Sequence, residues 1–174
     1  MNLPGEKKRR LFFALWPDNG VRVKLLRVAR EYVRRPPSAA NLHMTLVFLG
    51  DCTEQQLSCS RAAVAGLEAP MFELEMDYLG AFPRAGIQWL GLGSVPARLP
   101  QLVAQLQQAL TGCGFEPEKR RFVPHITLAR KVRKPLVRAG LEAIHWPVRD
   151  FVLAESVSVS GGVEYRVLDR WPLK

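Results

Sequence analysis

The chain has 174 residues, of which 48% are hydrophobic, and its formal net charge is +9. This length fits one domain, and this composition supplies a real core, which excludes a generally disordered chain. No run of 18 apolar residues occurs, so we expect no membrane partner, and the surplus of positive charge favours a polyanion such as RNA. The plain alternative is a protein that is merely basic.

Apolar spacing predicts the order strand, helix, strand, helix, strand, strand, helix, strand, strand, strand. The expected ranges are 11–16, 21–33, 41–50, 53–67, 72–76, 87–92, 96–112, 123–128, 151–159 and 163–168. Asp18 is a candidate helix cap, Thr53 opens a capping box, and Gly161-Gly162 is typical of a hairpin turn. Because βαβ units do not alternate regularly, the order favours an α+β fold with mainly antiparallel sheet and helices packed outside.

The cysteines Cys52, Cys59 and Cys113 are few and odd in number, and they lack metal-ligand spacing. This argues against a disulfide framework and against a zinc site. The apolar run after the basic residues 7–10 stops at Pro17 without a small-residue cleavage site, so we expect no signal peptide. Reduced thiols and a cytoplasmic location are therefore the expectation.

Two short stretches, Asn41 to Leu46 and Val123 to Leu128, share the order His, apolar residue, Thr, Leu. Two of three histidines would precede a threonine in this way in roughly 0.2% of shuffled sequences. A β-strand sends residues i and i+2 to the same face, so each histidine shares a face with its threonine. If the two strands lie side by side, two imidazoles and two hydroxyls surround one pocket.

Such a pocket has the groups needed to open a cyclic phosphodiester. One histidine can activate water as a base while the other protonates the leaving oxygen, because both titrate near neutral pH. The hydroxyls of Thr45 and Thr127 can donate to the phosphoryl oxygens where charge builds up. A single His-x-Thr is more often a structural histidine, and His145, which has no such threonine, is interpreted as structural or surface.

Both motifs resemble the two His-x-Thr-x motifs of the 2H phosphoesterase superfamily. The flanking residues resemble its bacterial RNA 2′,3′-cyclic phosphodiesterase branch, whose members are also called 2′-5′ RNA ligases. The resemblance covers nearly the whole chain, and its matching segments are 10–14, 41–50, 122–130 and 165–173. It implies one domain, 1–174, of two similar lobes related by pseudo-twofold symmetry, with the active site in the cleft between them.

The resemblance also implies an activity. Its substrate would be RNA with a 2′,3′-cyclic phosphate end, with transfer-RNA fragments as candidates, and its product a 2′-phosphate. His43 would be the proton donor to O3′ and His125 the proton acceptor, with no metal and no cofactor. In reverse, the same residues would perform 2′-5′ RNA ligation. We expect the protein to act as a monomer.

Beyond the motifs, the basic stretch 119–134 has candidate phosphate and RNA contacts. Arg130 lies on the opposite face from His125 by strict alternation, but the family often places an arginine there near the phosphate, and a bulge or strand end could turn it inward. The candidates for an RNA backbone track are Lys131, Arg133 and Lys134. The aromatics Phe12, Phe48 and Trp89 could stack a base, although core packing is the first expectation for each.

Two other functions stay open at this stage. One is a non-catalytic RNA-binding module on the same scaffold, which the net charge of +9 would explain. The other is a sibling 2H enzyme that acts on a small cyclic nucleotide. Turnover of a 2′,3′-cyclic nucleotide in EDTA would distinguish an enzyme from the RNA-binding module. Competition by RNA ends would distinguish an enzyme that acts on RNA from one that acts on a small nucleotide.

Overall fold

The computed structural model describes residues 7–174, and this part of the chain contains eight strands and three α-helices. The strands are β1 (Arg9–Leu15), β2 (Met44–Cys52), β3 (Phe72–Phe82), β4 (Ile87–Leu92), β5 (His125–Ala129), β6 (Ile144–Val148), β7 (Asp150–Val159) and β8 (Gly162–Pro172). The helices are α1 (Asn19–Tyr32), α2 (Glu54–Val64) and α3 (Arg98–Leu110), and the short 3₁₀ turns are η1 (Ala39–Asn41), η2 (Pro83–Ala85) and η3 (Thr111–Cys113).

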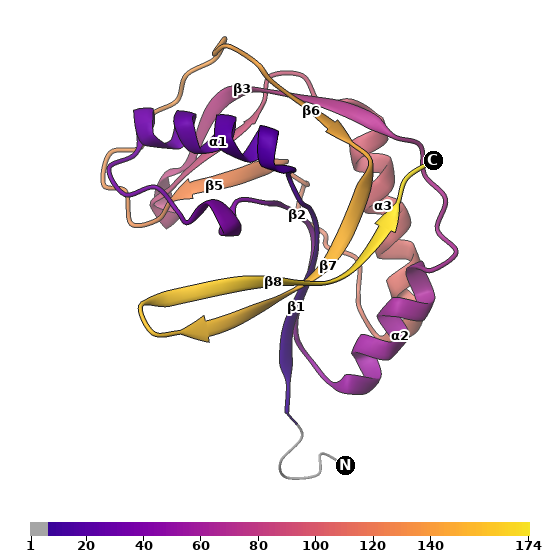
Figure 1. Cartoon of the computed structure of the whole chain (residues 1–174). Coiled ribbons are helices and arrows are strands. Elements are labelled where there is room, and N and C mark those ends of the chain that lie inside the picture. The colour runs from indigo at the N-terminus through magenta and orange to yellow at the C-terminus, as the bar shows by residue number, and fades with distance from the viewer. Residues whose placement is uncertain (1–6) are drawn as a thin grey trace.

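The strands form two four-stranded sheets, in the orders β2-β1-β7-β8 and β5-β4-β3-β6. All strand pairs between these named strands are antiparallel, which confirms the α+β class. The strands β2 and β5, which carry the two motifs, each lie at an edge of their sheet, and the two edges contact each other. The motif strands therefore meet at the boundary between the sheets (Figure 1).

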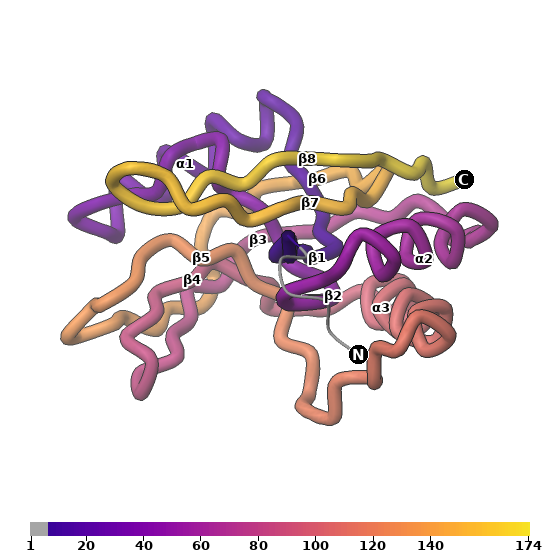
Figure 2. The backbone as a smooth tube through the Cα atoms, turned by 90° about the horizontal axis from the view of Figure 1, so that it is seen from below, coloured from indigo at the N-terminus to yellow at the C-terminus, as the bar shows by residue number. Residues whose placement is uncertain are grey.

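Each motif strand is the last element of the same succession, a strand, then a helix, then the motif strand. The first is β1-α1-β2 and the second is β4-α3-β5. Each connecting helix packs against the sheet to which its own two strands do not belong. Helix α1, between β1 and β2, packs against β6, and α3, between β4 and β5, packs against β2 (Figure 1). The third helix, α2, lies beside α3 at one end of the molecule (Figure 2). This equivalence gives the two lobes their pseudo-twofold relation.

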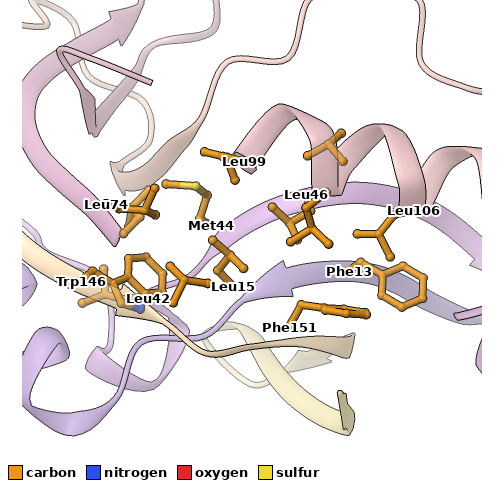
Figure 3. Packing of buried hydrophobic residues seen from close by; sticks show 14 of the residues in the cluster. Phe13, Leu15, Leu42, Met44, Leu46, Leu74, Leu99, Leu106, Trp146 and Phe151 are labelled. Atoms are coloured by element: carbon orange, nitrogen blue, oxygen red, sulfur yellow. The ribbon is translucent and has the colours of Figure 1, made fainter. Parts of the chain in front are cut away.

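One hydrophobic core lies between the sheets and under the helices. It takes Phe13 and Leu15 from β1, Met44 from β2, Leu74 from β3 and Leu106 from α3, all fully buried (Figure 3). The other face of β1 packs into a small second cluster formed by Phe12, Ala14, Val152 and Ala154. Strand β1 is buried on both faces, which explains why its apolar run has no alternation.

The predicted helix caps and the predicted hairpin are present in the structure. The Asp18 carboxylate accepts a hydrogen bond of 2.8 Å from the Val21 amide and caps α1. Thr53 and Gln56 bond reciprocally as a capping box at α2, and β7 and β8 form the predicted hairpin. Within residues 7–174, no helix has the length and apolar character to cross a membrane.

Some predicted boundaries were wrong. Strand β3 continues to Phe82, well past the expected end at residue 76, and α3 begins at Arg98 rather than at Pro96. Strand β6 was not predicted, because Pro147 argues against a strand; β6 is an edge strand, where proline is tolerated. His145 lies on β6 with its side chain 63% exposed, 3.7 Å from the Glu75 carboxylate, and is a surface residue as predicted.

The prediction of reduced cysteines was also wrong. Cys59 on α2 and Cys113 in η3 form a disulfide, with their Cα atoms 5.7 Å apart. Sequence spacing gave no sign of the pair, because the packing of α2 beside η3 brings together residues that are 54 positions apart. Cys52 is free and buried, and burial raises the pKa of its thiol to about 11, so it is protonated at neutral pH.

Candidate active site

The two motifs open onto one cavity of about 510 Å³ at the boundary of the sheets. His43 immediately precedes β2 and His125 is the first residue of β5, so both histidines lie where their strands begin. Thr45 and Thr127 follow on the same faces, as the two-residue period predicts. The cavity wall consists of both motif pairs together with Arg10, Phe12, Arg35, Pro37, Asn41, Phe48, Leu128, Ala129, Arg130, Ser156, Val163 and Tyr165.

Equivalent hydrogen bonds hold the two imidazoles. Nδ1 of His43 lies 2.8 Å from the carbonyl oxygen of Asn41, and Nδ1 of His125 lies 2.7 Å from that of Val123. A carbonyl oxygen only accepts, so Nδ1 carries a proton in both rings and Nε2 is the nitrogen free to exchange one. Nε2 of His43 lies 3.1 Å from the Thr45 hydroxyl, which can donate to it.

Aromatic side chains surround His43. The Trp16 indole stacks on the imidazole, with ring centroids 5.4 Å apart and an interplanar angle of 14°. Phe12 lies 4.9 Å away and Tyr165 meets the ring edge-on at 4.7 Å. The Asn41 side chain fixes this wall, because its amide group donates to the Val163 carbonyl at 2.8 Å and accepts from the Tyr165 amide at 3.2 Å.

His125 has its own aromatic support from the other sheet. Phe82 meets the imidazole edge-on, with centroids 5.1 Å apart, and Trp89 lies 5.9 Å away. The Trp89 indole passes over Gly80 and Gly91, where an added Cβ would collide with it. Glycine at these two positions is therefore needed for the ring that supports His125.

The surroundings keep both imidazoles neutral at pH 7. Burial lowers the pKa of His43 to about 4, against the opposing effect of the Asn41 carbonyl and with the help of the Arg130 charge and, when it is protonated, of His125. Burial also lowers the pKa of His125, and Arg130 acts in the same direction while the Val123 carbonyl opposes it. Both imidazoles therefore have an unprotonated Nε2 at neutral pH in the free protein.

Arg130 lies on the cavity wall, although strict alternation placed it on the other face. Strand β5 ends at Ala129, and the backbone turns at Lys131, whose φ is 58°. The strand end releases Arg130 from the alternation. Lys131, Arg133 and Lys134 follow on the surface and do not line the cavity.

The segment after β5 is fastened to its sheet by a buried glutamine. Gln88 is 2% exposed, and its side-chain nitrogen donates to the carbonyls of Gly80 and Leu136 at 2.7 Å each. Its side-chain oxygen accepts from the Leu136 amide, also at 2.7 Å. The Val132 amide adds a bond of 2.9 Å to the Gly86 carbonyl. These bonds hold the basic segment beside the cavity.

Several wall residues were not predicted from the sequence. Arg10, Arg35, Asn41, Ser156 and Tyr165 come from segments that meet the motifs only in the folded chain. Strand alternation could have predicted Arg10 as a wall residue, because it lies two residues before Phe12 and shares its face of β1. Arg35 follows α1 at its C-terminal end, and the helical spacing did not distinguish it from the other exposed arginines.

Two matched His-x-Thr strands that meet at one cavity between two antiparallel sheets define a 2H phosphoesterase. Residues 15–160 match the family model of the 2′-5′ RNA ligase superfamily, and the chain belongs to this family. It is 30% identical to the RNA 2′,3′-cyclic phosphodiesterase of Escherichia coli, over 95% of this chain and 97% of that protein. It is 34% identical to the Thermus thermophilus protein of the same name, over 95% and 90% of the two chains.

A solved structure of E. coli LigT complexed with 3′-AMP has the same fold. It superposes with a TM-score of 0.88 at 29% identity and covers 96% of this chain and 99% of that one. The agreement extends over both sheets, so the fold class predicted from the sequence is confirmed.

Proposed function

We propose that this protein hydrolyses the 2′,3′-cyclic phosphate ends of RNA to 2′-phosphates by two-histidine acid–base catalysis. The enzyme class, an RNA 2′,3′-cyclic phosphodiesterase, follows from the family and from the full-length relatives of that name. The observation that supports the mechanism is the equivalent pair of imidazoles on one cavity, each held through a protonated Nδ1 so that Nε2 is the nitrogen that can exchange a proton. The two lobes, one around each motif, would together form a single domain.

In the proposed reaction, Nε2 of His125 takes a proton from water as the water oxygen attacks phosphorus. The bond from phosphorus to O3′ breaks, and Nε2 of His43 gives its proton to O3′. The phosphate stays on O2′, so the product is a 2′-phosphate. The hydroxyls of Thr45 and Thr127 and the guanidinium of Arg130 would stabilise the negative charge on the non-bridging oxygens.

Binding of the substrate has to raise the pKa of His43 before this residue can act as the acid. With its pKa lowered to about 4, His43 is neutral in the free protein, and the anionic phosphodiester in the cavity would raise this pKa by direct attraction. The same anion acts on His125, whose pKa is also lowered. The roles of donor and acceptor therefore depend on which imidazole faces O3′ when the substrate is bound.

An RNA end with a 2′,3′-cyclic phosphate in which sulfur replaces O3′ tests the roles, because a thiolate leaves without a proton. His43→Ala and His125→Ala should each lower kcat for the oxygen substrate by about 10²- to 10⁴-fold. With the sulfur substrate, the defect of His43→Ala should largely disappear and that of His125→Ala should remain. The opposite pattern would exchange the roles, and near-normal turnover of either variant with oxygen would make that histidine structural.

The absence of metal from the reaction is a separate part of the proposal. Two imidazoles supply the acid and the base, so hydrolysis of a 2′,3′-cyclic nucleotide should persist in EDTA. Loss of activity in EDTA and its return with zinc or manganese would overturn this reading. Ligation would use the same groups: the 5′-hydroxyl of one RNA attacks the 2′,3′-cyclic phosphate of another, the bond to O3′ breaks, and incubation of the two RNAs at high concentration should give a 2′-5′ bond.

RNA, rather than a free nucleotide, is the proposed substrate. A cyclic mononucleotide would contact only the cavity, whereas an RNA strand would continue along Lys131, Arg133 and Lys134. Changing these three residues to serine should weaken RNA binding and flatten its salt dependence, by about 0.7 per lost phosphate contact in the log–log slope. Mononucleotide turnover should not change. Unchanged RNA affinity and salt slope would show that this stretch is not the track, and the arginine-rich face of α1 would then be the next candidate.

A cytoplasmic location and a monomeric state are also parts of the proposal. The cytoplasmic location was expected partly because the cysteines were expected to be reduced. The disulfide between Cys59 and Cys113 removes that support, because disulfides are rare in reducing compartments. Sedimentation of the purified protein would test the monomer, and thiol trapping in intact cells would show whether the bond forms in the cytoplasm.

A further inference from the structure

Strand β5 ends immediately before the arginine that lines the cavity. Its last residue, Ala129, pairs with Gln88 on β4, and the pairing of the two strands is irregular between Gln88 and Trp89. The residues that follow, 130–138, contain no helix and no named strand, and we call this segment the strap. Arg130 is the first residue of the strap and lines the cavity together with Ala129.

The Arg130 guanidinium is not held by an acidic side chain. None of the ion pairs within residues 7–174 includes Arg130, and its side chain is exposed. The backbone turns directly after it, because Lys131 has a φ of 58°. The position of the guanidinium therefore depends on how firmly the rest of the strap is held.

Hydrogen bonds, rather than hydrophobic burial, hold the strap. Leu136 and Val137 are large apolar side chains, yet they are 54% and 59% exposed. At the end of the strap, Arg138 exchanges two backbone hydrogen bonds with Leu79 on β3, of 2.8 and 2.9 Å. The middle of the strap is fastened by the side chain of Gln88.

The Gln88 carboxamide bonds to the strap as a neighbouring strand would. Its nitrogen donates to the Leu136 carbonyl and its oxygen accepts from the Leu136 amide, both at 2.7 Å. The same nitrogen donates to the Gly80 carbonyl, which fixes the side chain to β3. A carboxamide has the two donors and the acceptor that this requires, whereas a methionine of similar size has no donor and an ionised glutamate has only acceptors.

We propose that Gln88 is a positioning residue, which ties the strap to β3 and β4 and thereby holds the Arg130 guanidinium at the cavity to meet the substrate phosphate. The contact of Arg130 with phosphate rests on the proposed function. Gln88 itself does not line the cavity. Because it acts through Arg130, its loss should have no further consequence at the cavity once the guanidinium has been removed.

A double-mutant cycle between Gln88 and Arg130 tests this dependence. Gln88→Met keeps the size of the side chain but removes its three hydrogen bonds. It should lower kcat/KM for a 2′,3′-cyclic nucleotide by up to about 100-fold, the loss that a displacement of about 1 Å in a site can cause. In an Arg130→Ala background the same change should have no further effect. Gln105→Met, the same change on the exposed face of α3, should leave kcat/KM unchanged.

The histidine signals in NMR spectra give a second measurement, which needs no turnover. Burial lowers the pKa of both motif imidazoles, and the Arg130 charge acts in the same direction. If the strap loosens, this charge moves away from the cavity. Gln88→Met should therefore raise the pKa of His125, as Arg130→Ala does, and should not raise it further in the double variant. Titration with inorganic phosphate, followed by the same signals, should show weaker binding in each single variant.

The outcomes distinguish positioning from a contribution to stability alone. A Gln88→Met variant that unfolds more easily but keeps its kcat/KM and the pKa of His125 would show that Gln88 supports only the fold. An equal loss of kcat/KM with and without Arg130 would also overturn the proposal, because Gln88 would then act by another route. Gln88→Glu, which keeps the shape of the side chain and the acceptor for the Leu136 amide, is a second variant with the same expectations. If the unmodified protein hydrolyses no cyclic phosphate, the proposed function fails, while the NMR titrations still decide whether Gln88 positions Arg130.

Discussion

The neutral, buried imidazole of His43 should make the stability of the protein depend on pH. Its pKa is about 4 in the folded protein and about 6.5 in an unfolded chain. Between these values the unfolded state binds the proton more strongly, so the free energy of unfolding falls as the pH is lowered. The loss from this one group begins near pH 6.5 and is complete below pH 4.

The size of this effect follows from the two pKa values. Proton linkage gives a loss of about 2 kcal/mol at pH 5 and about 3 kcal/mol at pH 4, relative to pH 7. His125, whose pKa is also lowered, adds to the loss in the same direction. A domain with a typical stability of about 5–15 kcal/mol would therefore lose a substantial fraction of it from the site alone.

Urea unfolding, followed by tryptophan fluorescence at pH 7, 6, 5 and 4, measures this loss. His43→Asn keeps a side-chain donor for the Asn41 carbonyl but cannot titrate. Between pH 7 and pH 5, its free energy of unfolding should therefore fall by about 2 kcal/mol less than that of the unmodified protein. His145→Asn, the same change at an exposed surface histidine, should behave like the unmodified protein. If His43→Asn keeps the full pH dependence, the imidazole is not held neutral and the account of its burial is wrong.

Three further predictions concern the hydroxyls, the buried glutamine and the disulfide. Thr45→Ala and Thr127→Ala should each lower kcat by up to about 100-fold without lowering the melting temperature, and a variant that melts early but turns over normally would have a structural threonine. Gln88→Leu removes the side-chain partner of the buried Gly80 carbonyl and of the partly buried Leu136 amide and carbonyl, so urea unfolding should show a loss of about 1–3 kcal/mol, whereas an unchanged midpoint would show that water replaces the glutamine. Cys113→Ser should lower stability by at most about 4 kcal/mol, the chain-entropy value for a separation of 54 residues, and a reducing agent should then have no further effect; a variant as stable as the oxidised protein would show that the bond contributes nothing.

The sequence predicted what depends on local pattern. The two-residue period placed each motif histidine and threonine on one face, and the helix caps at Asp18 and Thr53 were readable from single residues. The matching flanks of the two motifs indicated a common pocket, and the structure brings His43 and His125 onto the same cavity.

What could not be predicted depends on departures from regular pairing or on contacts between distant segments. The pairing of β1 with β2 shifts register between Phe13 and Ala14, which places Phe48 on the cavity face together with Thr45, and an alternating pattern does not show such a shift. Strand β6 was obscured by Pro147, which only an edge position tolerates. The disulfide depends on how α2 packs beside η3, and no spacing along the chain encodes that contact.

The single core described above also limits how the protein can move. Side chains from both sheets and all three helices belong to one buried cluster, with Met44 and Leu74 from opposite sheets packed close together (Figure 3). A close-packed interior does not shear or open without losing contacts, so the lobes cannot separate and close around a ligand as hinged domains do. Substrate would be admitted by movements of side chains at the cavity mouth. The histidines are accordingly held at a fixed separation before any substrate arrives, and bound and free forms should superpose.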